Sequence, residues 1–227
     1  METFISNIIR IMSRYGHVFL LEGVAYTLLL SLIAVAGGSV LGALFAFGKR
    51  GKIPPLRILI NALVEIVRGT PLLLQLYAGV FILPRLIPAL NELPDIVSVS
   101  VVLIINSAAY VSEVIRSGIQ AVDIGQTEAA RSLGLSERTT MWNVVLPQAV
   151  KNILPALLNE FIALLKETSV AGYVGIMDLT KGGDTIRGVT YSSFMPLLAV
   201  ALIYLVIVVI LTKLVSVVER KLRKNER

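Results

Sequence analysis

The sequence predicts an all-α membrane protein with about five transmembrane helices, its N-terminus outside and its C-terminus inside. Of the 227 residues, 56% are hydrophobic and 16% are charged, whereas soluble domains average about 45–50% and about 25%. The apolar residues form unbroken blocks rather than the alternating segments of about ten residues found in outer-membrane barrels. Because one crossing needs about 20 helical residues, the chain has room for five or six spans and no separate soluble catalytic domain.

Residue usage excludes several kinds of site. The chain has no cysteine and one histidine, His17, so it has no disulfide, no thiolate or histidine metal cluster and no histidine-based triad. Its net charge of +6 comes without a nucleic-acid-binding motif or aromatic residues interleaved with a basic face. We therefore expect no metal, no nucleic-acid partner and no cofactor held by this chain.

The elements follow in order along the chain. Residues 1–17 place apolar side chains among polar ones at helical spacing, the pattern of an amphipathic helix at the membrane interface. Residues 18–217 form one transmembrane domain, and 218–227 form a basic tail. The spans are predicted at about 19–47, 56–83, 96–119, 149–173 and 194–215. In the first span three glycines, at positions 37, 38 and 42, allow a neighbouring helix to approach closely.

The distribution of lysine and arginine sets the predicted orientation. One set of loops, together with the C-terminal tail, carries thirteen of these residues, and the other set carries five. Since cytoplasmic loops are enriched in both residue types, the first set is predicted to be cytoplasmic. That side includes the longest loop, about 120–148, and the basic tail, whose charges also attract anionic lipids.

The second span is interrupted by Arg68-Gly69-Thr70-Pro71. A proline inside a span frees backbone carbonyls, and interrupted helices point to transport sites, although kinks also arise for packing alone. Thr70 is therefore a candidate for the substrate pathway, and Pro71 for a structural or gating role. Gln75 and Tyr77 are further pathway candidates, with helix packing as the alternative.

The loop at about 120–148 has the pattern of helix, turn and helix. A run of good helix formers ends at Gly134, where a left-handed C-terminal cap would lie. Ser136 can cap a second helix over about 137–145, and Pro147 can open the next span in its first turn. A helix with alanine on one face and charges on the other suits insertion into a groove of a partner protein.

The loop and four other segments carry motifs at fixed spacing. In the loop these are Glu128-Ala129-Ala130, Gly134 and Val144-Val145-Leu146-Pro147. Elsewhere they are Glu65 with Arg68-Gly69-Thr70-Pro71, Tyr110 with Glu113 and Arg116, Gly125-Gln126, Asn159-Glu160-Phe161 and Lys166-Glu167-Thr168-Ser169. The combination resembles the permease subunits of binding-protein-dependent ABC importers with their "EAA" loop, in particular the polar amino-acid branch. Val144 stands where that family usually has isoleucine, and the resemblance covers nearly all of 23–212.

The resemblance implies a type I ABC importer permease fold in the bacterial inner membrane, paired with an identical or related permease chain. It implies that the loop helix couples to a cytoplasmic ATPase dimer through Glu128, Ala129, Ala130, Arg131, Leu133 and Gly134. Because the chain has no G-x-x-x-x-G-K-[ST] phosphate loop, ATP and Mg are expected on that partner, and the chain is a transport subunit rather than an enzyme. An extracytoplasmic amino-acid-binding protein is expected to deliver the substrate.

Charged residues inside spans are functional hypotheses, because an ionised side chain at mid-bilayer costs about 2.5–3.5 kcal/mol. Glu160 lies roughly 16 Å along the fourth span at about 1.5 Å per residue. There it could hold a substrate ammonium group with help from Asn159, or it could form a structural pair with a basic group. Glu167 shares the face of Glu160, and Lys166 is expected to reach the outer interface, so both are assigned structural or gating roles.

Two further pairs of charges are three residues apart, Glu113 with Arg116 and Glu65 with Arg68. Local ion pairs are therefore expected. Pairing favours structural or gating roles for these residues, with Glu113 kept as a candidate for the substrate pathway.

The sequence as a whole predicts a permease subunit that imports a polar amino acid, with a basic one as the narrower hypothesis. Two alternatives stay open. One is an ion-coupled secondary transporter with Glu160, Glu113 and Glu65 as relays, and the other is a membrane scaffold whose loop recruits a partner. The outer loop 172–193 is either a contact for the binding protein or an ordinary hydrated loop.

Overall fold

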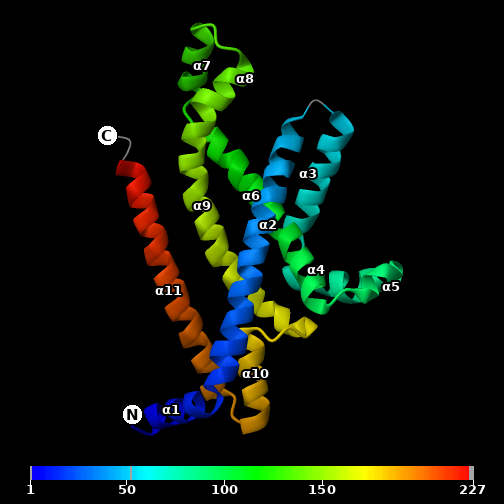
Figure 1. Cartoon of the computed structure of the whole chain (residues 1–227), viewed down its shortest axis with the longest axis vertical. Coiled ribbons are helices and arrows are strands. Elements are labelled where there is room, and N and C mark those ends of the chain that lie inside the picture. The colour runs from blue at the N-terminus through cyan, green and yellow to red at the C-terminus, as the bar shows by residue number, and fades with distance from the viewer. Residues whose placement is uncertain (1, 52, 225–227) are drawn as a thin grey trace.

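The computed structural model describes residues 2–51 and 53–224, and this part of the chain is almost entirely helical with no strand. The long helices run roughly along the long axis of the molecule (Figure 1); they are α2 (Ala25–Arg50), α3 (Pro54–Gly69), α6 (Asp95–Gln120), α9 (Leu146–Glu167) and α11 (Phe194–Lys224). The predicted all-α fold class is confirmed.

Short helical segments connect the long helices and cover both ends of the molecule. The α-helical ones are α1 (Glu2–His17), α4 (Leu72–Tyr77), α5 (Leu83–Leu86), α7 (Ile124–Ser132), α8 (Glu137–Thr140) and α10 (Leu179–Thr190). Wider π-helical turns are η1 (Val18–Val24), η2 (Ala78–Ile82) and η4 (Met141–Val145), and tighter 3-10 turns are η3 (Pro88–Glu92) and η5 (Thr168–Val174). In Figure 1, α7 and α8 lie at the top, whereas α1 and α10 lie at the bottom.

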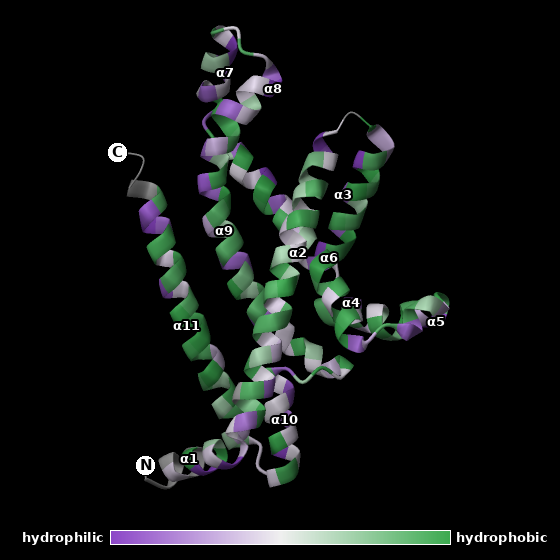
Figure 2. Ribbon diagram, in the orientation of Figure 1, coloured by the Kyte–Doolittle hydropathy of each residue, from purple (hydrophilic) through white to green (hydrophobic). Residues whose placement is uncertain are grey.

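Three helices in the described part of the chain are long and apolar enough to cross a membrane, over residues 21–50, 95–120 and 194–222. Hydrophobic residues dominate these helices, whereas hydrophilic ones are frequent on α7 and α8 (Figure 2). The predicted second span is a bent pair, because α3 and the segment 72–86 meet at 111°. The predicted fourth span, α9, does not meet the same criterion, since its lysine, asparagine and glutamate residues lower its mean hydropathy.

Several boundaries differ from the prediction. The fourth helix begins three residues earlier and its α-helical part ends at Glu167, because a 3-10 turn follows. It also continues directly from α8 through the π-turn η4, since a wider turn before Pro147 accommodates the missing N–H of that proline. The predicted basic tail starts inside α11, which continues to Lys224, and 225–227 lie outside the described residues.

The tightest packing lies between α2 and α6, and the predicted glycines make it possible. A Cβ atom added at Gly38 would lie 2.5 Å from the Cβ of Ser107, and one at Gly42 would lie 2.8 Å from the Cβ of Val111. The order of these contacts shows that the two helices run in the same direction. The buried core continues from this seam through Leu30, Ala34, Leu76, Val99, Leu103 and Leu164.

Candidate functional site

A hollow of about 400 Å³ lies between α3, α6 and α9, and it brings three predicted charges together. Arg68 comes from the last turn of α3, Glu113 from α6 and Glu160 from α9. Tyr110, one turn before Glu113, Ser117, one turn after it, and Asn152, two turns before Glu160, complete its polar lining. Side chains of both charge signs therefore face one space within the helices.

Glu113 is the centre of an ion network that joins three helices. Its Oε1 accepts from Lys49 Nζ at 2.6 Å, and its Oε2 accepts from Arg116 Nε at 2.8 Å. Arg68 Nη1 lies farther from Oε2, at 3.8 Å, and its guanidinium lies 5.6 Å from the centre of the Tyr110 ring. The network thus ties the ends of α2 and α3 to α6.

Of the two predicted local ion pairs, one is present and one is not. Arg116 pairs with Glu113 as expected. Glu65 is exposed, and among the described residues no basic side chain lies within ion-pair distance of it. The expected pair with Arg68 was wrong, because Arg68 turns toward Tyr110 and Glu113 on α6.

Lys49 is the functional candidate that the sequence argument missed. Its side chain is only 11% exposed, although in the sequence it reads as one of several basic residues that mark the cytoplasmic side. The signal that could have found it is the glycine series of α2. Close parallel packing of α2 and α6 brings the residue eleven positions after Gly38 near Glu113 on α6.

Glu160 is half-buried and makes no ion pair or hydrogen bond with any side chain in the described part of the chain. Its predicted helper Asn159 does not line the hollow, because Asn159 is exposed and its Nδ2 donates to the Pro155 carbonyl at 3.1 Å. Lys166 and Glu167 are both exposed at the end of α9. The structure therefore leaves Glu160 as the member of this group that faces the hollow.

The break between α3 and α4 is closed by its own side chains. Gln75 Nε2 donates to the Val67 carbonyl at 2.7 Å and to the Thr70 carbonyl at 3.0 Å. Gln75 Oε1 accepts from Asn106 Nδ2 of α6 at 3.0 Å, and Thr70 Oγ1 donates to the Ile66 carbonyl at 2.8 Å.

These hydrogen bonds bear on the predicted pathway residues. The carbonyls freed by Pro71 are satisfied within the fold, so Thr70 and Gln75 hold the bend, and neither lines the hollow. Tyr77 also lies outside it, with its ring centre 5.9 Å from that of Phe81. These three side chains make the packing contacts of the alternative, and a pathway role for them stays a prediction.

The loop between α6 and α9 has the predicted helix, turn and helix. Gly134 follows α7 with a φ of +81°, a conformation that favours glycine, and Ser136 accepts from the Thr139 N–H at the start of α8. The sequence argument did not identify the cap of the first helix, where Asp123 Oδ1 accepts from the Gly125 N–H at 2.7 Å. Arg131 Nη1 donates to the Leu135 carbonyl at 2.6 Å and so ties the turn to α7.

The α7 helix presents an unusual surface for a polar loop. Ala130 is buried against the molecule, whereas Glu128 and Ala129 are exposed. Leu133 is 82% exposed and Ile124 is 69% exposed, which leaves two large apolar side chains uncovered at the tip of the molecule. Exposed apolar groups at a projecting tip are typical of a contact surface for another protein.

A second hollow, of about 1090 Å³, lies below this loop. Its lining includes Lys49, Glu113 and Arg116 from the ion network and Arg131 and Glu137 from the loop. Glu113 lines both hollows. The ion network therefore stands between the hollow among the helices and the base of the loop.

Comparison with known proteins places the chain in a family. Residues 38–224 match the model of the binding-protein-dependent transport system inner membrane component. A permease protein of Rickettsia conorii named for a glutamine transport system is 40% identical over 207 residues, which are 91% of this chain and 94% of that protein. The arginine transport system permease protein of Bacillus subtilis is 40% identical over 208 residues, 92% of this chain and 94% of that protein.

Solved structures of ABC transporters share the fold of this chain. A crystal structure of an amino acid ABC transporter with histidines superposes with a TM-score of 0.87 at 42% identity, covering 92% of this chain and 96% of that chain. The methionine ABC transporter in an inward-facing conformation gives a TM-score of 0.73 at 20% identity, which shows the shared fold. The chain therefore belongs to the family of inner membrane components of binding-protein-dependent transport systems, as a multi-pass permease subunit of an amino-acid ABC transporter.

Proposed function

We propose that this chain forms half of the pathway by which a polar amino acid is imported, driven by ATP hydrolysis on a partner ATPase. The observation that carries the proposal is that Arg68 and Glu160, of opposite charge, line one hollow between α3, α6 and α9. A free amino acid carries a carboxylate and an ammonium group, so it offers a charge of the required sign to each side chain.

Both side chains are available to a ligand. Glu113 has closer partners in Lys49 and Arg116, so Arg68 keeps hydrogen-bond donors for a substrate carboxylate. Glu160 has no ion-pair partner within the described residues and can accept from an ammonium group. The hollow is lined by one cation, Arg68, and two carboxylates, Glu113 and Glu160. Because Glu113 is already paired with Lys49 and Arg116, one charge of each sign is left for a ligand, which favours a zwitterionic polar amino acid over the narrower hypothesis of a basic one.

The loop supplies the route from the ATPase to this hollow. It joins α6 to α9, and these helices carry Glu113 and Glu160. Ile124 at the start of α7 and Leu133 directly after its end fit the pattern of an apolar helix face that enters a groove of a partner. Closure of an ATPase dimer with bound ATP and Mg would move α7, change the separation of α6 and α9, and so alter access to the hollow.

Two more partners follow from the proposal. A second permease chain, identical or related, would close the open side of the hollow, and a binding protein would deliver substrate near α1, α10 and the outer loop. With the loop in the cytoplasm, as the sequence predicts, the ATPase and the binding protein would lie on opposite sides of the membrane.

The first test asks what assembles with the chain. The tagged chain would be extracted from its native membranes in mild detergent, and co-purifying proteins and ATPase activity would be measured, with Gly134→Asp as the variant that destroys the turn after α7. We expect an ATPase with a phosphate loop to co-purify with the wild type and to be lost with the variant. Uptake by the chain alone, driven by an ion gradient, would instead support a secondary transporter.

The second test addresses the substrate site in the reconstituted complex. We expect Glu160→Gln and Arg68→Gln each to raise the substrate concentration for half-maximal uptake by about 30-fold, because a charged group of the enclosed substrate that loses its partner costs about 2 kcal/mol. Glu65→Gln, an exposed carboxylate on the same helix as Arg68, is the matched control and should leave uptake unchanged. Normal uptake in both variants would place the substrate elsewhere.

A further inference from the structure

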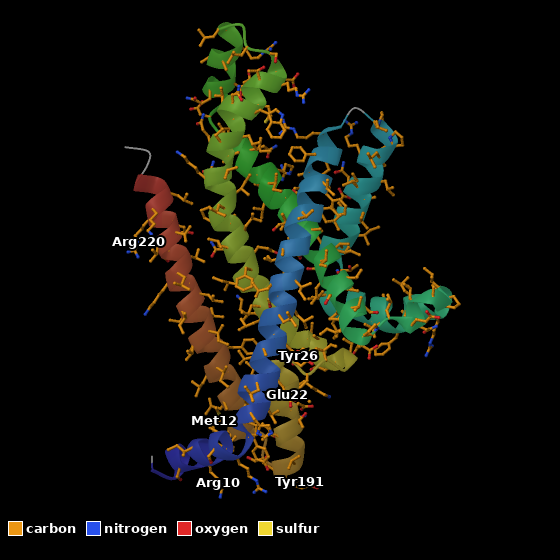
Figure 3. The ribbon with its side chains drawn as sticks, in the orientation of Figure 1. Arg10, Met12, Glu22, Tyr26, Tyr191 and Arg220 are labelled. Atoms are coloured by element: carbon orange, nitrogen blue, oxygen red, sulfur yellow. The ribbon has the colours of Figure 1, made fainter. Side chains whose placement is uncertain are left out.

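A third hollow lies at the end of the molecule opposite the loop between α6 and α9. It has a volume of about 420 Å³ and lies between α1, the end of α10 with the residues that follow it, and the start of α11. Arg10 and Tyr191 both lie at this end in Figure 3. The polar part of its lining consists of Arg10, Arg14, Tyr15, Thr190 and Ser192, and Ile11, Val189 and Met195 form the apolar part.

The two arginines have no anionic partner in the described part of the chain. Asp184 on α10 pairs with Arg187, and Glu22 in η1 lies beyond ion-pair distance of both. Arg14 is exposed, and its guanidinium lies 5.6 Å from the centre of the Tyr15 ring, a contact that leaves its charge unneutralised. Like charges four residues apart on a helix repel each other, so the pair favours an external anion.

The hollow is anchored on an apolar cluster. Ile11 of α1 is buried with Phe19, Ile186 and Val200, so α1 presents its apolar face to the bundle and Arg10 and Arg14 border the hollow. Figure 1 shows α1 running sideways across the end of the long helices, as expected for a helix in a membrane interface.

The residues around the mouth of the hollow suit the level of lipid headgroups. Tyr191 is 97% exposed and has a left-handed backbone with a φ of 52°, which holds its ring outward at the end of α10. Tyrosine is enriched at membrane interfaces. The candidate span of α11 begins three residues later, and its first turns expose Phe194 and Leu197.

We infer that this hollow binds the phosphate of an anionic phospholipid headgroup between Arg10 and Arg14. Guanidinium groups match phosphate oxygens with two parallel hydrogen bonds, and Ser192 adds a hydroxyl donor. A volume of about 420 Å³ equals roughly fourteen water molecules at about 30 Å³ each, which is room for a headgroup rather than a bare ion.

The apolar part of the lining favours a lipid over free phosphate. Met195 and Val189 offer contacts that an inorganic anion cannot use, and the exposed apolar residues of α11 continue from the hollow into the hydrocarbon region. The lipid would hold α1 against α10 and α11. This inference does not depend on the substrate site between α3, α6 and α9.

The test measures lipid binding by the full chain in detergent, using native mass spectrometry and the thermal unfolding midpoint. Phosphatidylglycerol, phosphatidylcholine and inorganic phosphate would be compared at equal concentrations. We expect one tightly held phosphatidylglycerol per chain and a raised midpoint, with weaker binding of phosphatidylcholine and no shift with phosphate. Equal binding of the two lipids, or an equal shift with phosphate alone, would overturn the assignment.

Variants locate the site. Replacing both arginines, Arg10→Gln with Arg14→Gln, should weaken phosphatidylglycerol binding about 25-fold, because each basic side chain near an anionic surface contributes about fivefold. Arg57→Gln with Arg138→Gln removes the same charge from exposed positions at the opposite end of the molecule and should leave binding unchanged. Equal losses in the two double variants would show general charge attraction instead of a site.

A double variant that keeps both positive charges tests the site even if Arg10→Gln with Arg14→Gln does not fold. Arg10→Lys with Arg14→Lys retains the charge that α1 carries but lacks the planar fork of donors. We expect it to remain monodisperse and to bind phosphatidylglycerol severalfold more weakly than the wild type. Unchanged affinity in this variant would contradict recognition of phosphate by the arginine forks.

Discussion

The α2–α6 seam and the α3–α4 break hold neighbouring parts of the molecule by different means. Along the seam, two continuous helices pack through glycines with almost no space between them. At the break, one polar side chain, Gln75, spans the gap and bonds to both α3 and α6. The seam therefore has no freedom to slide, whereas the break depends on a few hydrogen bonds that a rearrangement could exchange.

The turn before α10 repeats the pattern of the break. Asp178 is fully buried, and its two carboxylate oxygens accept from the N–H groups of Gly172 and Lys181 at 3.0 Å and 2.6 Å. The next residue, Leu179, donates its N–H to Thr27 of α2 at 3.1 Å. A single polar residue thus closes each of the two bends. One bend bonds to α6 and the other to α2, the two helices that pack along the glycine seam.

The largest expected effect concerns Asp178 and pH. Burial raises its pKa from 3.8 to about 6, although hydrogen bonds from neighbouring N–H groups oppose the shift. The folded state then binds the proton more tightly than the unfolded state, so stability is greatest below about pH 4 and falls as pH rises to about 6. Two pKa units correspond to about 3 kcal/mol. The measurement is the unfolding midpoint across pH 4–7 for the wild type and Asp178→Asn.

The effect of Asp178 is the difference between the two curves of unfolding midpoint against pH, one for the wild type and one for Asp178→Asn. Other carboxylates titrate in both proteins, so the wild-type curve should fall relative to the variant between about pH 4 and pH 6. Parallel curves would show that the burial of Asp178 does not control this bend.

The next effect tests the point where the seam and the break meet. Glu113→Gln should lower the free energy of unfolding by about 2–3 kcal/mol, because it leaves Lys49 with little solvent and no carboxylate partner. This is less than the roughly 3–5 kcal/mol of a fully buried pair, since Glu113 remains 19% exposed. Chemical or thermal unfolding in detergent would measure it. Glu65→Gln is the control, and an equal loss in both variants would remove the special role of Glu113.

The seam itself is tested by a matched pair of glycines. Gly38→Ala places a Cβ against Ser107, whereas Gly16→Ala meets nothing within 4 Å. The higher helix propensity of alanine should raise the free energy of unfolding by about 1 kcal/mol in both variants. In Gly38→Ala, overpacking should outweigh this gain and lower the free energy of unfolding by about 2 kcal/mol overall. The difference in unfolding midpoint between the two variants is the measurement. If Gly38→Ala is as stable as Gly16→Ala, the seam is looser than the structure indicates.

The smallest effect is expected at the break. Gln75→Ala should cost about 1–2 kcal/mol, because the Val67 carbonyl and the Asn106 amide lose their shared partner. Gln120→Ala removes one exposed hydrogen bond to Arg116 and should cost less. Amide hydrogen exchange should rise in 66–77 for Gln75→Ala alone. Protection equal to the wild type there would show that Pro71 and packing hold the bend without Gln75.

The sequence predicted some of the site and missed other parts for identifiable reasons. Gly134 and Ser136 were predictable because caps depend on local backbone geometry. Glu113, Arg68 and Glu160 were identified as charges in spans, but their convergence on one hollow depends on three helices from distant parts of the chain. Thr70 and Gln75 were assigned to the pathway because the sequence shows a break without showing which groups satisfy it.

The sequence by itself determined the all-α membrane fold, the interrupted second span and the loop pattern that marks the family. These depend on hydropathy, proline and glycine, whose effects act within one or two helical turns. The tertiary structure alone decided that Lys49 pairs with Glu113 and that Arg68 lies near Glu113 on α6 and not near Glu65. It also decided that Arg10 and Arg14 border a hollow. Ion pairs and hollows form between helices, so their partners are set by how the helices pack and not by spacing along the chain.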